Sequence, residues 1–316
     1  MRKANKIISI MLIVACTLSC SFVALANEDQ TDSTEIEYSY AAFPDEFNPN
    51  VSFHDIEIGI FDFISKRNLN IELGSEEYVE LMYDFLYGEI SNIEEVTERY
   101  FGDYASVYVA KVQENLDPIP SSRTTERYNI DLPGTIEETK QANMERINAL
   151  KNSATNSPTT RSSNFDLSRA QAYAEEYALS WNYVYGRYSS DCTNFASQIL
   201  HYAGMPLVSG QWQYNGNELA KRRWNVAHDF IDYFGLERGY AYNAYATRAE
   251  VNTYARPGDF MGYMSDDTYT IWHVVFVQSK VNGEIYVSQH TTDRFNERWN
   301  SINITRPSTY FINRFT

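Results

Sequence analysis

The sequence predicts an α+β fold in which helices precede an antiparallel sheet. In several segments between residues 75 and 234, apolar side chains recur at spacings of three and four, the period of an amphipathic helix. After Pro257 the pattern changes to short runs of β-branched and aromatic residues separated by turn residues, which is typical of strands joined by tight turns. Because the helices come before the strands instead of alternating with them, the order of elements indicates α+β.

The first 26 residues have the layout of a secretory signal peptide. Basic residues precede an apolar run from residue 7 to about residue 18, and an Ala-Leu-Ala tripeptide ends at Ala26. We expect cleavage after Ala26, and the alternative is a lipoprotein anchored at Cys16. No other stretch reaches the roughly 18 consecutive apolar residues of a membrane helix. The sequence therefore predicts a secreted or cell-wall-associated protein without stable membrane insertion.

The mature chain is expected to be strongly acidic. The 316 residues include 26 Lys and Arg against 42 Asp and Glu, and removal of the three basic leader residues changes the formal net charge from −16 to −19. Such a chain repels phosphate backbones, which argues against binding nucleic acid through bulk electrostatics. The charge suits an extracellular protein that acts on neutral or cationic substrates.

Residues 27–151 are expected to form a mainly helical region that follows an acidic start. The predicted helices cover residues 75–88, 95–117 and 135–151, and the second and third open with capping boxes at residues 91–94 and 135–138. No catalytic constellation is evident in this region. It is interpreted as a helical accessory region, with a propeptide-like cover or a substrate-positioning module as the alternatives.

Residues 152–163 contain no large apolar side chain and are interpreted as a Ser/Thr-rich linker to a second domain, residues 164–316. In this domain one helix is expected from Ser168 and another from Cys192 to about Tyr202. A further helix is predicted over residues 223–234, and strands over residues 259–264, 271–279, 284–290 and 302–305.

Cys192 is the one cysteine that remains once the leader, with Cys16 and Cys20, is removed. An unpaired thiol in an exported protein is either reactive or a buried apolar residue. Its place at the predicted start of a helix favours a reactive thiol, because unpaired amides and the macrodipole stabilise a thiolate there. The backbone N–H of Cys192 can also donate to a developing oxyanion.

His273 is the candidate base for Cys192, because a polar residue in a strand of apolar ones must face a cleft or a buried partner. If residues 282–283 form a two-residue hairpin turn, the register places His290 on the same face as His273 and Gln289 on the opposite face. His290 is therefore the candidate that orients the imidazole of His273. A single β-bulge would exchange it for Gln289.

The order of motifs in the second domain resembles that of NlpC/P60-type cysteine peptidases and amidases, and most closely their amidase-domain family. The resemblance covers residues 165–316. The segments that carry it are Tyr183-Val184-Tyr185-Gly186, Asp191-Cys192-Thr193-Asn194-Phe195-Ala196-Ser197-Gln198, Pro257-Gly258-Asp259-Phe260, Trp272-His273-Val274 and Ser288-Gln289-His290-Thr291-Thr292-Asp293.

This resemblance implies a papain-like core in which the nucleophile helix packs on an antiparallel sheet. It also implies Cys192 as nucleophile, His273 as base, His290 as the third polar residue and Tyr183 as a residue that lines the site. Asp191 and Gln289 are further candidates for substrate binding or oxyanion support.

Together these residues predict an exported thiol hydrolase that cleaves an amide bond in a peptide or peptidoglycan-like substrate. The reaction would pass through a thioester on Cys192, with His273 protonating the leaving amine, and would need no cofactor. The alternatives are a catalytically silent binding module on the same fold and a transglutaminase-like acyl transferase. Zinc binding is not favoured, because the mature chain has a single cysteine and no pair of ligand residues at the short spacing that is usual for zinc sites.

Overall fold

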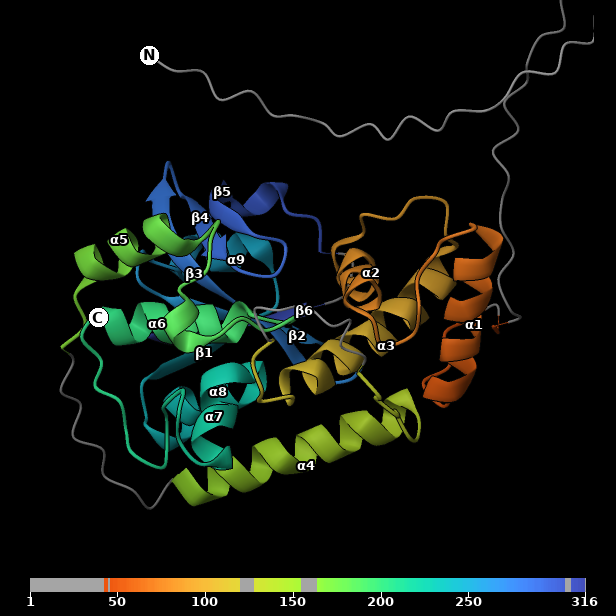
Figure 1. The fold of residues 1–316 in the computed structure, drawn as a ribbon, viewed down its shortest axis with the longest axis horizontal. Helices are drawn as coiled ribbons and strands as arrows, with labels where there is room; N and C mark the ends of the chain where they lie inside the picture. The colour runs from red at the N-terminus through yellow and green to blue at the C-terminus, as the bar shows by residue number, and fades with distance from the viewer. Residues whose placement is uncertain (1–42, 45, 120–127, 155–163, 305–307, 316) are drawn as a thin grey trace, which may run out of the picture. The chain divides into compact units, whose positions relative to one another are not determined.

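The computed structural model describes residues 43–44, 46–119, 128–154, 164–304 and 308–315, which all belong to one compact unit, Glu37–Thr316. The expected signal peptide and most of the expected linker lie outside these described residues. The elements can be followed in Figure 1. They combine helices with an antiparallel sheet, so the fold class is α+β, with a helical N-terminal region.

In the N-terminal region the described residues form α1 (Phe53–Lys66), α2 (Glu76–Tyr87), α3 (Glu95–Gln113) and α4 (Ile136–Ala154). The prediction of α2 is confirmed: the side chain of Ser75 accepts a hydrogen bond from the backbone N–H of Tyr78, and Gly88 ends the helix with a φ of 58°. The sequence prediction contains no counterpart of α1, and α4 extends to Ala154 inside the segment interpreted as a linker.

One of the two predicted capping boxes is present. At α4 the backbone N–H of Thr135 donates to the carboxylate of Glu138, and the N–H of Glu138 donates to the hydroxyl of Thr135. The box predicted at residues 91–94 is wrong, because the N-cap of α3 is Glu94 and this residue makes no side-chain cap hydrogen bond.

In the C-terminal region the described helices are α5 (Leu167–Tyr177), η1 (Tyr183–Tyr185), α6 (Cys192–Tyr202), α7 (Glu218–Asn225), α8 (Ala227–Asp232), η2 (Tyr233–Glu237), α9 (Arg248–Tyr254) and η3 (Trp299–Ser301). The prediction of α6 is confirmed at both ends. The helix predicted over residues 223–234 is divided, because Val226 adopts an extended conformation between α7 and α8.

The sheet contains β1 (Ala241–Tyr245), β2 (Phe260–Ser265), β3 (Ile271–Val281), β4 (Glu284–Gln289), β5 (Arg294–Arg298) and β6 (Ser308–Arg314). Neighbouring strands are antiparallel, in the order β1-β6-β2-β3-β4-β5. The predictions of β2, β3 and β4 are confirmed. The strand predicted over residues 302–305 is wrong where the chain is described, because Ile302 to Ile304 form no strand.

The hairpin of β3 and β4 contains a β-bulge. Next to the turn the register follows the prediction, with Val281 opposite Glu284 and Ser279 opposite Tyr286, but Val277 then pairs with Val287, which leaves Gln278 as the extra residue. One extra residue exchanges the two faces for the remainder of a strand. The expectation that His290 shares a face with His273 is therefore wrong.

Gln171 of α5 holds this bulge by two hydrogen bonds. Its side-chain amide donates to the carbonyl oxygen of Gln278 at 2.7 Å, and the side-chain amide of Gln278 donates to the carbonyl oxygen of Gln171 at 3.2 Å. The bulge is thus fixed by a contact between α5 and the sheet, which no pattern within the hairpin sequence encodes.

The sheet has an apolar cluster on each face. On one face, side chains of β2 and β3 such as Tyr263, Trp272 and Val275 belong to the same cluster as residues of α1, α2 and α3. On the other face, Phe260, Val274 and Phe276 pack with α5, α6 and α8. The helical N-terminal region and the sheet therefore share one hydrophobic core, and the two sets of helices appear in orange to yellow and in green in Figure 1.

Candidate active site

Cys192 is the first residue of α6, and its side chain is fully buried. Its Sγ lies 3.6 Å from the hydroxyl of Thr193 and 3.6 Å from Nε2 of Gln113. Burial raises the pKa of the thiol to about 11, and the hydrogen bonds from Thr193 and the backbone of Val274 only partly oppose this. The helix start does not produce a thiolate in this closed arrangement, because desolvation outweighs the helix end and the nearby donors.

His273 lies on β3, between two residues whose backbone groups lie at the Cys192 site. The residue before it, Trp272, accepts a hydrogen bond through its carbonyl oxygen from the same Gln113 amide that reaches Sγ, and the residue after it, Val274, contributes a backbone hydrogen bond to Cys192. The backbone on both sides of His273 therefore faces the nucleophile.

Aromatic rings enclose the imidazole of His273. The rings of Tyr83, Tyr87, Tyr263 and Trp272 have centroids 5.4 to 6.2 Å from the imidazole. Burial lowers the pKa of His273 to about 3, so the ring is neutral at physiological pH. Within the described residues, neither ring nitrogen makes a hydrogen bond of normal geometry.

Gln289 is the polar group that opposes this pKa shift of His273. Its Nε2 donates to the hydroxyl of Tyr87 at 3.1 Å and to Oγ1 of Thr292 at 2.9 Å, which fixes the orientation of the amide. Its Oε1 accepts no hydrogen bond from the described residues. Gln289 is therefore placed to accept from a ring N–H of His273 after a small movement of either side chain.

His290 occupies a different place from the one predicted. Its Nδ1 lies 2.5 Å from Oδ2 of Asp191 and its Nε2 lies 2.8 Å from the carbonyl oxygen of Tyr177, while its ring stacks on Phe195 at 4.0 Å. Burial lowers the pKa of His290, but the hydrogen bond and charge of Asp191 outweigh burial, so the pKa is raised. Since both ring nitrogens face acceptors, His290 pairs with Asp191 instead of orienting His273.

Asp191 positions the start of α6. Its carboxylate accepts hydrogen bonds from the backbone N–H of Tyr188 at 3.1 Å and from the side-chain amide of Asn194 at 2.9 Å, in addition to the contact with His290. Its own N–H donates to the hydroxyl of Thr291 at 2.8 Å. A carboxylate engaged in this way holds the loop before Cys192, and its negative charge would oppose an oxyanion, so the prediction of oxyanion support does not fit its geometry.

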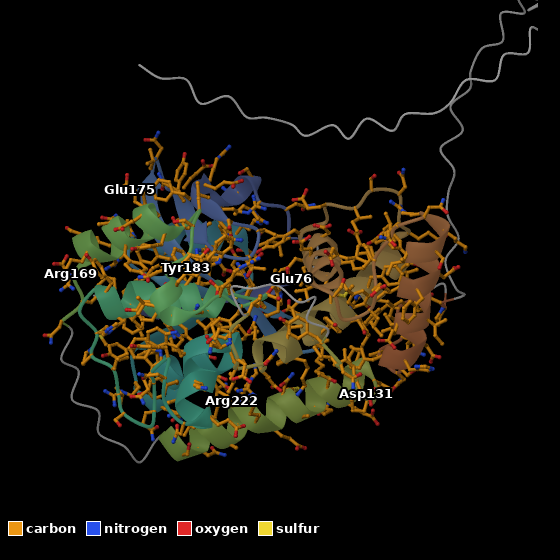
Figure 2. The ribbon with its side chains drawn as sticks, in the orientation of Figure 1. Glu76, Asp131, Arg169, Glu175, Tyr183 and Arg222 are labelled. Atoms are coloured by element: carbon orange, nitrogen blue, oxygen red, sulfur yellow. The ribbon has the colours of Figure 1, made fainter. Side chains whose placement is uncertain are left out.

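Tyr183 does not share the enclosed environment of Cys192. It lies in the short helix η1, where Figure 2 labels it, and the residue is 72% exposed. Its role in lining the site stays a prediction.

Sequence reasoning missed three residues from the N-terminal region that contact this site. Tyr83 and Tyr87, one turn apart on α2, pack against His273, and Gln113 at the end of α3 contacts Cys192. Their sequence signal was an ordinary amphipathic helix. Because they are separated from Cys192 by more than 75 residues, only the fold brings them together.

A cavity of about 240 Å³ opens beside the buried pair. Asp191, Thr291, Thr292, Glu80 and Trp181 are among the residues that line it, and neither Cys192 nor His273 is among them. The cavity therefore reaches the loop next to the nucleophile without reaching the sulfur.

The described residues contain no group of three or more His, Cys, Asp or Glu side chains that could hold a metal ion. Within the same portion of the chain, no helix combines the length and the apolar character that crossing a membrane requires.

Residues 164–312 match the family model described as "Putative amidase domain". The segment is thus similar to that family, and it is called the amidase-like domain below. Over 146 residues the chain is 28% identical to the uncharacterized protein YhbB of Bacillus subtilis (strain 168), covering 44% of this chain and 45% of that protein. Over 139 residues it is 31% identical to the uncharacterized protein YjcM of the same strain, covering 40% and 31%.

The chain thus spans less than half the length of these curated relatives. No solved structure matches the chain at a significant level. The matched segment contains Cys192, His273, Gln289 and His290.

Proposed function

We propose that the amidase-like domain is a cysteine-dependent amidase or peptidase with a papain-like arrangement of the NlpC/P60 type. The observation that carries this proposal is the placement of Cys192 at the start of α6, against the segment of β3 that contains His273. Gln289 lies on the neighbouring strand β4, on the same face of the sheet as His273. This placement supports a Cys-His-Gln arrangement in place of the Cys-His-His arrangement expected from the sequence.

In the proposed reaction, the thiol proton of Cys192 passes to a ring nitrogen of His273 and the sulfur electron pair bonds to the carbonyl carbon, whose π pair moves to oxygen. The C–N bond then breaks and His273 gives its proton to the leaving amine. Water attacks the resulting thioester with His273 as base, the C–S bond breaks, and the proton returns to sulfur. The products are an amine and a carboxylic acid.

In this proposal a movement of α2 admits substrate to Cys192. The thiol and the imidazole are both neutral in the closed arrangement, because burial raises the pKa of Cys192 to about 11 and lowers that of His273 to about 3. Tyr83 and Tyr87 cover the pair. A shift of α2 would admit water, and both pKa values would then move towards their ordinary values.

The proposed substrate is a peptide or peptidoglycan-like polymer outside the cell, since the first 26 residues have the layout of an export signal. In this proposal α2 acts as the cover, which narrows to one helix the propeptide-like cover considered for residues 27–151. The support for a cover is the pair of tyrosines from α2 that closes the site.

The experiment is incubation of the full-length secreted protein with purified peptidoglycan and, separately, with simple peptide amides, with Cys192→Ala as the control. Mass spectrometry would show hydrolysis products that the control does not form, and addition of a free amine would show whether acyl transfer competes with hydrolysis. A wild-type protein that forms no product from either substrate would support the silent binding module, whose favouring observation is the fully buried Cys192.

A further inference from the structure

Gln113, the last residue of α3, lies outside the amidase-like domain but reaches its nucleophile. Its side chain is 2% exposed. Its Oε1 accepts a hydrogen bond from the backbone N–H of Ala227 at 2.8 Å, and its Nε2 donates to the carbonyl oxygen of Trp272 at 2.8 Å. These two backbone groups fix the amide in one orientation. In a flipped amide the NH₂ group would face the N–H of Ala227 and the oxygen would face the carbonyl oxygen of Trp272.

In this orientation the second N–H of Gln113 is directed to the nucleophile, with Nε2 3.6 Å from Sγ of Cys192. A neutral thiol is a weak acceptor, whereas a thiolate accepts a charge-assisted hydrogen bond that is about twice as strong as a neutral one. The contact therefore gains strength when the proton leaves the sulfur.

Helix α3, which carries Gln113, packs against α2 and is also anchored to the sheet by contacts of its own. Side chains of α3 bind the loop between β2 and β3 directly: the hydroxyl of Ser106 lies 3.1 Å from that of Thr268, and the guanidinium of Arg99 forms two hydrogen bonds with Asp267 at 2.6 and 2.8 Å. α3 can therefore stay on the sheet while α2 moves.

We propose that Gln113 is a further catalytic residue, whose Nε2–H donates to the Cys192 thiolate and so completes the site from outside the amidase-like domain. This inference rests on the proposed cysteine chemistry. The N-terminal helices then have separate roles, since α2 covers the site and α3 supplies one of its donors. The amidase-like domain is incomplete without α3.

The test is the pH dependence of Cys192 alkylation by iodoacetamide, a neutral probe, in the full-length protein and in Gln113→Leu. Loss of a charge-assisted donor should raise the midpoint by about one to two pH units, which is a tenfold to hundredfold loss of thiolate at a given pH below both midpoints. If Gln113→Leu fails to fold, as judged by thermal unfolding, Gln113→Glu replaces it, because one carboxyl oxygen still accepts from Ala227. Its second oxygen cannot donate as an amide does, so a rise is again expected.

The matched control is Gln198→Leu. Gln198 is another buried amide, on α6 itself, and it accepts a hydrogen bond from the hydroxyl of Tyr173 at 2.7 Å, away from the sulfur. An unchanged midpoint in the Gln113 variant, or an equal rise in Gln198→Leu, would overturn the proposal. Because alkylation needs no substrate, a shifted midpoint together with absent amide hydrolysis would reject the proposed hydrolase and keep the contact of Gln113 with the sulfur.

Discussion

At Cys192 two physical effects act on the same thiol in opposite directions. A helix N-terminus stabilises a negative charge by about 0.3–1 kcal/mol at an exposed position, and this effect is visible in the sequence as the start of α6. Burial acts the other way, and the pKa of about 11 shows that it dominates. The resting site thus holds a neutral thiol, and its reactivity depends on exposure.

Substitutions can distinguish Gln289 from His290 as the residue that orients His273 in the proposed catalytic site. His273→Ala should lower amide hydrolysis by about 10²–10⁴-fold, the usual contribution of a general base. Gln289→Ala should lower it by about tenfold, since one neutral hydrogen bond is lost. His290→Ala should instead lower the free energy of unfolding by about 3–5 kcal/mol, because it leaves Asp191 as an uncompensated buried charge. Kinetics and denaturation of each variant measure these effects, and a His290→Ala protein of normal stability with the same loss of activity as His273→Ala would contradict the assignment.

The two buried histidines should give stability opposite dependences on pH. The pKa of His273 is about 3 in the folded protein and has an ordinary value of 6.5, so only the unfolded chain binds this proton between these values and stability falls as pH drops from about 6.5 towards 3. The pKa of His290 is raised, so its contribution is complete below 6.5 and is lost as pH rises through the raised value.

Chemical denaturation between pH 4 and pH 9 measures both slopes. His273→Ala should reduce the loss of stability at acidic pH, and His290→Ala should reduce the loss at neutral to basic pH. His54→Ala, which changes an exposed histidine of α1, serves as the control. Identical profiles for the wild type and both variants would show that neither ring has the environment described.

Among the elements, the bulge in β3 and the helix α2 have the largest effect on the site. The bulge at Gln278 decides that Gln289, and not His290, shares the face of His273. Helix α2 decides the exposure of that face through two hydroxyl contacts: Tyr83 with Ser190 at 2.6 Å, and Tyr87 with the amide of Gln289 at 3.1 Å. One contact lies beside the nucleophile and the other beside the base. Loss of both contacts should therefore release α2 from the site.

Removal of both hydroxyls should loosen the cover. In the double variant Tyr83→Phe/Tyr87→Phe the rings remain and two hydrogen bonds are lost, each worth about 0.5–1.5 kcal/mol. The rate at which iodoacetamide alkylates Cys192 at fixed pH should rise about tenfold, because the open population grows. Tyr78→Phe on the same helix, where the ring packs against Tyr108, should leave the rate unchanged. A double variant that reacts at the wild-type rate would show that α2 does not control access.

At the scale of the whole molecule, the N-terminal helices and the sheet share one apolar cluster. The sequence predicts a linker between two domains at residues 152–163, and it contains no signal for the contact between them, because α2 and α3 are ordinary amphipathic helices whose partner surface is not encoded locally. Where the chain is described, the apolar faces of these helices are buried against β2 and β3, so the two regions are expected to unfold together.

A substitution in α3 tests this coupling. Phe101→Ala, at a fully buried residue of α3, should lower the free energy of unfolding by about 3–5 kcal/mol. The five tryptophans lie between residues 181 and 299, so their fluorescence originates in the C-terminal region, with Trp272 in contact with α2. Fluorescence and far-UV circular dichroism should nevertheless show the same lowered midpoint. A fluorescence transition that stays at the wild-type midpoint would show that the two regions unfold independently.

The sequence by itself determined the α+β class, the extent of α6 from Cys192 and the strands β2 to β4, because each depends on a period, a cap or a turn within a few residues. It also limited the third position to Gln289 or His290. Only the tertiary structure decided which of the two shares the face of His273, since a bulge held by Gln171 of α5 changes the strand face. Burial likewise decided that the thiol of Cys192 is neutral at rest and that Tyr83, Tyr87 and Gln113 surround the site, because these contacts join residues far apart in the chain.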